Sequence, residues 1–150
     1  MRVFILCTGR SGSTSIIHAC QHISNFTAAH ESQAKVFGDK RLDYPDQHIE
    51  ADNRLSWHLG QLDKKYGDEP IYVFMKRDRD KVAKSFTNRY YTKSIIDAFC
   101  EGIRMRPAEH LSPQELEQAC YDYVDTVNSN ITHFLKDKSC LLYTSDAADE

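Results

Sequence analysis

The stretch that decides the fold is Val3–Cys20, with the sequence VFILCTGRSGSTSIIHAC. Its first five residues are continuously apolar and rich in β-branched and aromatic side chains, which favours a strand buried on both faces of a parallel sheet. After a loop of small polar residues, apolar side chains recur at helical spacing, at Ile16, Ile17, Ala19, Cys20 and Ile23. The stretch therefore predicts a buried strand, a short loop and a helix.

The loop has the composition of an anion-binding loop. Small residues dominate it, so a ligand can approach their backbone N–H groups: Gly9, Ser11, Gly12, Ser13 and Thr14. These groups precede a helix, where the positive end of the helix dipole favours a bound anion such as phosphate or sulfate. A turn of the same composition that binds no ligand is the alternative that the residues leave open.

Two familiar phosphate-binding loops each lack a required residue here. A nucleoside-triphosphate P-loop ends in Gly-Lys-Ser/Thr, whereas Gly12 is followed by Ser13 and the loop contains no Lys. A tyrosine-phosphatase loop needs an Arg six residues after its Cys, and the residue six after Cys7 is Ser13. The stretch TGRSGSTS, residues 8–15, instead resembles the 5′-phosphosulfate loop of the sulfotransferase family, in the variant with Arg-Ser-Gly-Ser/Thr-Thr.

A second stretch, PIYVFMKRDRDKVAKSFTNRYY at residues 70–91, again runs from an apolar strand into a helix. In sulfotransferases, an Arg at the end of such a strand and a Ser eight positions later bind the 3′-phosphate of the donor. Arg77 and Ser85 keep that spacing, so the resemblance implies that they form the 3′-phosphate site. Arg79 stands where the family has Pro, which should loosen the start of the helix. Taken alone, the charged run would also fit a solvated turn.

The resemblance implies both a fold and a reaction. The fold is a three-layer α/β sandwich with a short parallel sheet, the P-loop NTPase-like fold of sulfotransferases, with its ligand crevice at the carboxyl ends of the strands. The reaction moves a sulfuryl group from 3′-phosphoadenosine 5′-phosphosulfate (PAPS) to a hydroxyl or amine of a small-molecule, carbohydrate or peptide acceptor. Gly9 to Thr14 would bind the 5′-phosphosulfate, and Arg10 would stabilise charge on the bridging oxygen. No metal is required.

The catalytic base is expected just after the second strand. The stretch NFTAAHES, residues 25–32, has the pattern of a short strand that ends at His30 and Glu31. Sulfotransferases of the tyrosylprotein and Golgi type have a Glu base at this distance from the loop Arg, which favours Glu31. His30 is the alternative, because imidazole titrates near neutrality and cytosolic members use His. His48 and Glu50 are more distant candidates, and Glu31 could also be a surface carboxylate without a role.

Two further patterns indicate scaffold. A helix from about Asn53 should bury Leu55, Leu59, Leu62 and Tyr66. A longer helix should begin with a capping box and carry one apolar stripe: Ser112, Pro113, Glu115, Leu116, Cys120, Val124, Val127, Ile131 and Phe134. His18 and His22 are spaced like metal ligands, but no third ligand accompanies them, so no metal site is expected.

Length and composition fit one modest α/β domain of 150 residues. No apolar run is long enough to span a membrane, and Met1 leads almost directly into the first strand, so neither an anchor nor a signal peptide is expected. The five cysteines lack Cys-x-x-Cys spacing, which favours reduced thiols in a cytoplasmic protein. We expect neither a nucleic-acid nor a membrane partner, and the oligomeric state is not indicated.

The last 11 residues of the chain are expected to be foreign to the protein. Residues 140–150, CLLYTSDAADE, match the read-through translation of a common sequencing adapter. We therefore expect a truncated sulfotransferase-like domain at residues 1–139 and a non-native segment at residues 140–150. Three of the 22 acidic residues lie in this segment, so the remainder carries 19 acidic and 19 basic residues and no net charge.

Two other functions remain open. One is a P-loop-type nucleotide kinase or NTPase with a degenerate loop, which the missing Lys and the lack of a clear magnesium-binding acid after a strand disfavour. The other is a nucleotide-binding remnant without catalysis. The acceptor is not predictable, because variable loops set it.

Overall fold

The computed structural model describes residues 1–90 and 94–145, without the side chains of residues 140–145. Its centre is a five-stranded sheet in the order β2-β3-β1-β4-β5, and every pairing is parallel. The strands are β1 (Arg2–Cys7), β2 (Thr27–His30), β3 (His48–Ala51), β4 (Ile71–Arg77) and β5 (Cys140–Ser145). The α/β class with a short parallel sheet is therefore confirmed.

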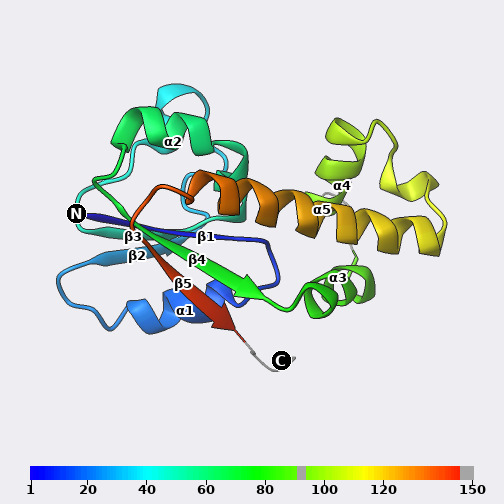
Figure 1. Cartoon of the computed structure of the whole chain (residues 1–150), viewed down its shortest axis with the longest axis horizontal. Helices are drawn as coiled ribbons and strands as arrows, with labels where there is room; N and C mark the ends of the chain where they lie inside the picture. Colours follow the sequence, from blue (N-terminus) through cyan, green and yellow to red (C-terminus); the bar gives the residue numbers. More distant parts are fainter. Residues whose placement is uncertain (91–93, 146–150) are drawn as a thin grey trace.

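Helices lie on both faces of this sheet (Figure 1). The α-helices are α1 (Ser13–Cys20), α2 (Leu59–Tyr66), α3 (Arg79–Asn88), α4 (Ile95–Ala98) and α5 (Pro113–Phe134). Short 3-10 helices span Gly38–Leu42, Asn53–Trp57 and Ala108–His110, and a π-helical turn spans Phe99–Ile103. With α1 on one face and α2 and α5 on the other, the arrangement is compatible with the three-layer sandwich that the sequence predicts.

The first strand is buried on both faces, as its continuous apolar run predicts. Phe4 and Leu6 belong to the larger core cluster, which also contains side chains of α2, α3 and α5. Ile5 and Cys7 point the other way and pack with Ile17 of α1 in a smaller cluster. Successive side chains of a strand alternate between its faces, so β1 joins the two hydrophobic layers.

Two of the expected helices differ in detail from the prediction. α1 ends at Cys20, and Ala19 is exposed because it lies about 200° around the helix from buried Ile17. The helix expected from about Asn53 is a 3-10 helix followed by α2, with the break at His58, whose backbone φ is −120°. The four side chains predicted to point inward are nevertheless buried: Leu55, Leu59, Leu62 and Tyr66.

The long helix α5 forms as predicted. Ser112 and Glu115 make both hydrogen bonds of the capping box, and Pro113 occupies the first turn. Its apolar stripe is buried at Cys120, Val124, Val127 and Ile131 and partly buried at Leu116 and Phe134. The helix packs against β1, α3 and α4, so it forms much of the larger core.

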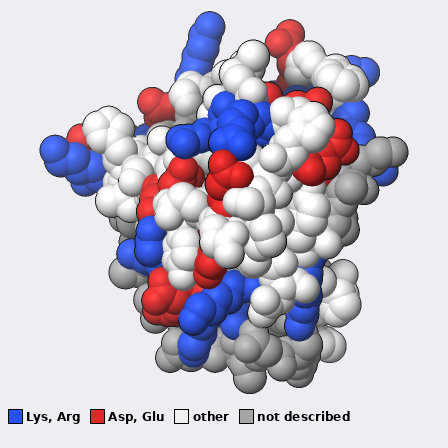
Figure 2. Space-filling model, turned by 90° about the vertical axis from the view of Figure 1, so that its right-hand side faces the viewer, with Lys and Arg blue, Asp and Glu red and all other residues white. Residues whose placement is uncertain are grey.

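Basic and acidic side chains are interspersed on the face that Figure 2 shows. Ion pairs join α5 to the segment before it, with Arg104 3.2 Å from Asp122 and Arg106 3.0 Å from Glu115. Both pairs are substantially exposed, so each contributes little to stability.

Within residues 1–90 and 94–145, no helix is long and apolar enough to cross a membrane. Cys7, Cys20, Cys100 and Cys120 are free thiols, and burial raises the pKa of Cys7 to about 12. Residues 140–145 form β5 beside β4. The foreign origin expected for residues 140–150 stays a prediction, and its last five residues lie outside the described part of the chain.

Candidate anion-binding site

The loop from Thr8 to Gly12 connects β1 to α1 and has a folded backbone. The Ser11 hydroxyl donates a hydrogen bond to the Thr8 carbonyl at 2.7 Å. Arg10 and Gly12 have left-handed backbone conformations, with φ of 64° and 94°. Because Gly12 is the N-cap, α1 begins without a side-chain cap, which leaves its first N–H groups suited to an anion.

Gly9 fixes the loop against the helices behind it. Its N–H faces the buried hydroxyl of Tyr123 at 3.5 Å, and burial keeps the pKa of that hydroxyl above its usual range. A Cβ atom at Gly9 would lie 3.0 Å from Cζ of Phe86 and 3.3 Å from Nδ2 of Asn53. Only glycine fits this close approach without displacing a neighbour.

The two stretches singled out in the sequence meet beside this loop. β1 and β4 are neighbouring parallel strands, with Cys7 opposite Met75, so their following loops emerge at the same edge of the sheet. Arg10 Nε donates to Ser85 Oγ at 3.2 Å, and Arg77 Nη1 donates to the Arg10 carbonyl at 3.0 Å. The structure thus brings together Arg10, Arg77 and Ser85, which are half-buried.

Arg79, which replaces the family's Pro, has a role in packing. Asp78 caps α3 by accepting a hydrogen bond from Lys81 N at 2.9 Å, so the start of the helix is fixed without Pro. Arg79 makes a two-pronged ion pair with Asp125 of α5, at 2.6 and 2.7 Å. This pair lowers the pKa of Asp125. The expected loosening of the helix start is therefore compensated by the Asp78 cap.

His30 lies next to the loop. Its Nε2 is 2.9 Å from the hydroxyl of Ser13, in the first turn of α1. Ser13 is buried, whereas Thr14 and His30 are exposed. The Ser13 hydroxyl therefore contacts His30, whereas the Thr14 side chain is exposed to solvent.

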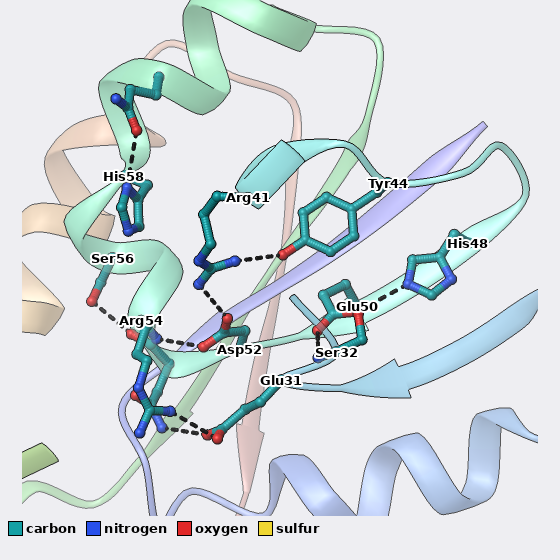
Figure 3. A network of polar contacts seen from close by, with 12 residues as sticks. Glu31, Ser32, Arg41, Tyr44, His48, Glu50, Asp52, Arg54, Ser56 and His58 are labelled. Atoms are coloured by element: carbon teal, nitrogen blue, oxygen red, sulfur yellow. Dashed lines mark hydrogen bonds and ion pairs between the residues drawn. The ribbon is translucent and has the colours of Figure 1, made fainter. Parts of the chain in front are cut away.

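Glu31 points toward the end of β3 rather than into solvent (Figure 3). Its Oε1 accepts a hydrogen bond from Asn53 Nδ2 at 2.8 Å, and its Oε2 lies 2.7 Å from Arg54 Nη1. Asn53 is also the side chain packed against Gly9, so it links Glu31 to the loop. The Glu31 side chain as a whole remains 27% exposed.

His48 and Glu50 are wrong as candidate bases. Glu50 is 0% exposed, and hydrogen bonds from Ser32 and His48 occupy both of its carboxylate oxygens. His48 is 6% exposed and contacts Thr27 through its second ring nitrogen at 2.7 Å. Because both side chains lie inside the sheet layer, an acceptor cannot reach them.

The sequence reasoning missed several residues around Glu31. Asp52 follows β3 and forms a buried ion pair with Arg41 at 2.6 Å, while its other oxygen accepts from Arg54 N at 2.8 Å. Arg41 also donates to the Tyr44 hydroxyl at 3.0 Å. The polar run Asp52-Asn53-Arg54, directly after a buried strand, could have indicated these residues in the sequence. In parallel sheets, ligand-binding side chains commonly follow the carboxyl ends of the strands.

A groove of about 760 Å³ lies beside this network, between the segment after Glu31 and α2, and Arg41 is one of its lining residues. Phe37, His58, Gln61 and Lys64 line it, and Phe37 is 94% exposed. Ala34 also lines the groove, and its N–H donates to the Glu31 carbonyl at 3.2 Å. The groove therefore begins in the same turn that carries Glu31.

Among the described residues, no group of three or more His, Cys, Asp or Glu side chains could hold a metal ion. The search for protein-family models and curated proteins similar to this chain found no match.

Proposed function

We propose that the chain is a PAPS-dependent sulfotransferase with the P-loop NTPase-like fold of that family. The observation that carries the proposal is the convergence of Arg10, Arg77 and Ser85 beside the start of α1. Arg10 is 67 residues from Arg77 and 75 residues from Ser85 in the sequence, yet the two stretches meet at one edge of the sheet. Two guanidinium groups, a hydroxyl and a helix N-terminus suit a ligand with two separate anionic groups.

PAPS has such a pair of groups. In the proposal, the N–H groups at the start of α1 hold the 5′-phosphosulfate, and Arg77 with Ser85 holds the 3′-phosphate. Arg10, which contacts Ser85 from the loop, stabilises the charge that develops on the bridging oxygen as its bond to sulfur breaks. Catalysis of this type of transfer depends on positioning the reactants and on electrostatic stabilisation of the transition state, as in phosphoryl transfer.

The base removes a proton from the acceptor while the acceptor oxygen or nitrogen attacks sulfur. The products are the sulfated acceptor and adenosine 3′,5′-bisphosphate. We assign this role to Glu31, because Asn53 and Arg54 orient its carboxylate and its side chain is not fully buried. His30 is the alternative base, since it lies at the loop and contacts Ser13.

We place the body of the acceptor in the groove between the segment after Glu31 and α2. Glu31, His30 and Arg10 do not line this groove, so the reacting group of the acceptor would have to extend from it to the loop. Phe37 offers an exposed ring for stacking, and Lys64 and Gln61 offer polar contacts. Such a lining suits a carbohydrate or peptide as well as a small aromatic molecule. The cytoplasmic location expected from the cysteine spacing also stays a prediction.

A nucleotide kinase or NTPase is the second candidate, and two acidic residues speak against it. Magnesium-binding acids of such enzymes commonly follow a strand. Asp52 follows β3 but is buried in its ion pair with Arg41, and Asp78 follows β4 but caps α3. Neither carboxylate is placed to receive a magnesium ion without giving up a structural contact.

A sulfate-transfer assay tests the proposal. The purified chain is incubated with PAPS labelled in its sulfuryl group and a panel of phenols, sugars and tyrosine peptides. Transfer of label to at least one acceptor, with release of adenosine 3′,5′-bisphosphate, is the expected result. Phosphate release from ATP with no sulfate transfer would support the kinase or NTPase instead.

A further inference from the structure

The buried carboxylate of Glu50 has no place in the reaction proposed above. It lies on β3, between β2 and β1, and is 0% exposed. A carboxylate is expensive to bury unless hydrogen bonds compensate for its lost hydration. Its partners therefore indicate what it does in the fold.

Two of the hydrogen bonds to Glu50 come from Ser32, the residue that follows Glu31. Ser32 N donates to Glu50 Oε1 at 2.8 Å, and Ser32 Oγ donates to Glu50 Oε2 at 2.6 Å. Ser32 is itself exposed, so these bonds fix a surface turn to a buried anchor (Figure 3).

This anchor acts on the conformation of Glu31. Glu31 has a φ of 53°, in the left-handed region that residues with a Cβ atom rarely adopt. Its own N–H donates to the Ala51 carbonyl at 2.9 Å, so β3 holds the turn on both sides of Glu31. The turn directs the Glu31 carboxylate to Asn53 and Arg54.

His48 completes the anchor from the opposite side. Its Nε2 lies 3.0 Å from Glu50 Oε2, and its Nδ1 lies 2.7 Å from the Thr27 hydroxyl. The His48 ring also stacks on Tyr44, with centroids 5.8 Å apart. If Nδ1 accepts from Thr27, the ring N–H is at Nε2 and points to Glu50, which gives the carboxylate its third donor.

We propose that Glu50 is a positioning residue that holds the candidate base Glu31 through Ser32. This inference rests on the proposed function, because it assigns the positioning to a catalytic step. Because Glu50 is fully buried, its assigned role is indirect. Its contribution is to keep Glu31 in the strained turn from which its carboxylate faces the loop.

The test is a double-mutant cycle between Glu50→Gln and Glu31→Gln in the full chain. The glutamine amide keeps the volume of the side chain but replaces one acceptor oxygen with a donor, so it loses a bond to Ser32 or His48. We expect Glu50→Gln to lower kcat by about tenfold or more, the order that a displaced catalytic group costs. The KM for PAPS and the affinity for adenosine 3′,5′-bisphosphate should change by less than about twofold.

In the Glu31→Gln background, Glu50→Gln should have almost no further effect on kcat, because the two residues act as one unit. Effects that multiply would overturn the proposal. Glu101→Gln, an exposed residue of the π-helical turn, is the matched control and should leave kcat unchanged.

Ser32→Ala covers the case in which Glu50→Gln does not fold. Ser32 is exposed, so the variant should fold while it loses the 2.6 Å bond to Glu50. It should lower kcat several-fold, again only when Glu31 is intact. Unchanged kcat in Ser32→Ala and Glu50→Gln would contradict the proposal.

A structural readout separates this inference from the proposed function. If the wild-type chain transfers no sulfate, the proposed function fails. A crystal structure of Glu50→Gln, or of Ser32→Ala, then decides the positioning role. A turn in which Glu31 has left Asn53 and Arg54 is expected, and an unchanged Glu31 would overturn the inference.

Discussion

The donor side and the base side of the candidate site are built in different ways. The donor side consists of a loop of small residues and three half-buried side chains, Arg10, Arg77 and Ser85, with hydrogen bonds between the two strand-loop-helix units. The base side rests on buried carboxylates on and directly after β3, with Glu50 at 0% and Asp52 at 1% exposure. Half-buried cationic side chains suit the binding of a charged donor, whereas a buried support suits a group that must keep one orientation.

The largest expected effect lies on the base side. Glu31→Gln keeps the size of the side chain but cannot accept a proton, so kcat should fall by roughly two to four orders of magnitude. Binding of adenosine 3′,5′-bisphosphate, measured by calorimetry, should stay intact. Near-normal turnover in Glu31→Gln, together with a folded but inactive His30→Ala, would transfer the role of base to His30.

The next largest effect lies at the loop. Arg10→Ala should lower kcat about 100-fold or more while donor affinity changes little, because the proposed contact strengthens as charge develops in the transition state. Steady-state kinetics measures kcat and calorimetry measures donor affinity on the same preparation. Arg89→Ala, which removes an exposed Arg just after α3, is the control. A loss confined to binding would make Arg10 a ground-state ligand of the donor.

A smaller effect should identify the phosphate that Arg77 contacts. Arg77→Ala should weaken binding of adenosine 3′,5′-bisphosphate by about 2 kcal/mol, the order of a lost charge-assisted contact. Binding of adenosine 5′-phosphate should barely change, since it has no 3′-phosphate. Calorimetric titration with both nucleotides measures the difference. Equal losses for the two would show that Arg77 does not recognise the 3′-phosphate.

The smallest effect is expected at Gly9, where the loop of the donor side packs against Asn53 of the base side. An added methyl at Gly9 would press on Phe86 and Asn53, so Gly9→Ala should lower the free energy of unfolding by about 1 kcal/mol or more. Gly60→Ala is the matched control, because nothing lies within 4 Å of a Cβ there and α2 should gain helix propensity. Urea denaturation compares the two variants. A Gly9→Ala variant as stable as Gly60→Ala would contradict the close packing of the loop.

The structure of the proposed donor side was predictable from the sequence because its determinants are local, whereas its role in binding a donor stays a prediction. The apolar run before Gly9, the small residues around Arg10 and the spacing of Arg77 and Ser85 are all visible within single strand-loop-helix stretches. The sheet then places the two loops together by pairing β1 with β4. Even there, local periodicity overestimated the apolar face of α1.

The base side was predictable only in part, because its contacts join residues distant in sequence. Glu31 could be proposed from its distance to the loop, but its partners Asn53 and Arg54 follow another strand. The same holds for Tyr123, which reaches Gly9 from the middle of α5. Hydrophobic periodicity places such helices in the core but does not specify which polar tip meets which loop.

The central claim is that the two loops recognise a nucleotide with both a 5′- and a 3′-anionic group. Calorimetry of the wild-type chain with adenosine 3′,5′-bisphosphate, adenosine 5′-phosphate and ATP tests it most directly. The account predicts one saturable site that binds the bisphosphate at least about tenfold more tightly than either competitor, since only it contacts Arg77 and Ser85 through a 3′-phosphate. ATP binding as tight as or tighter than the bisphosphate, or no binding of the bisphosphate at all, would contradict the account.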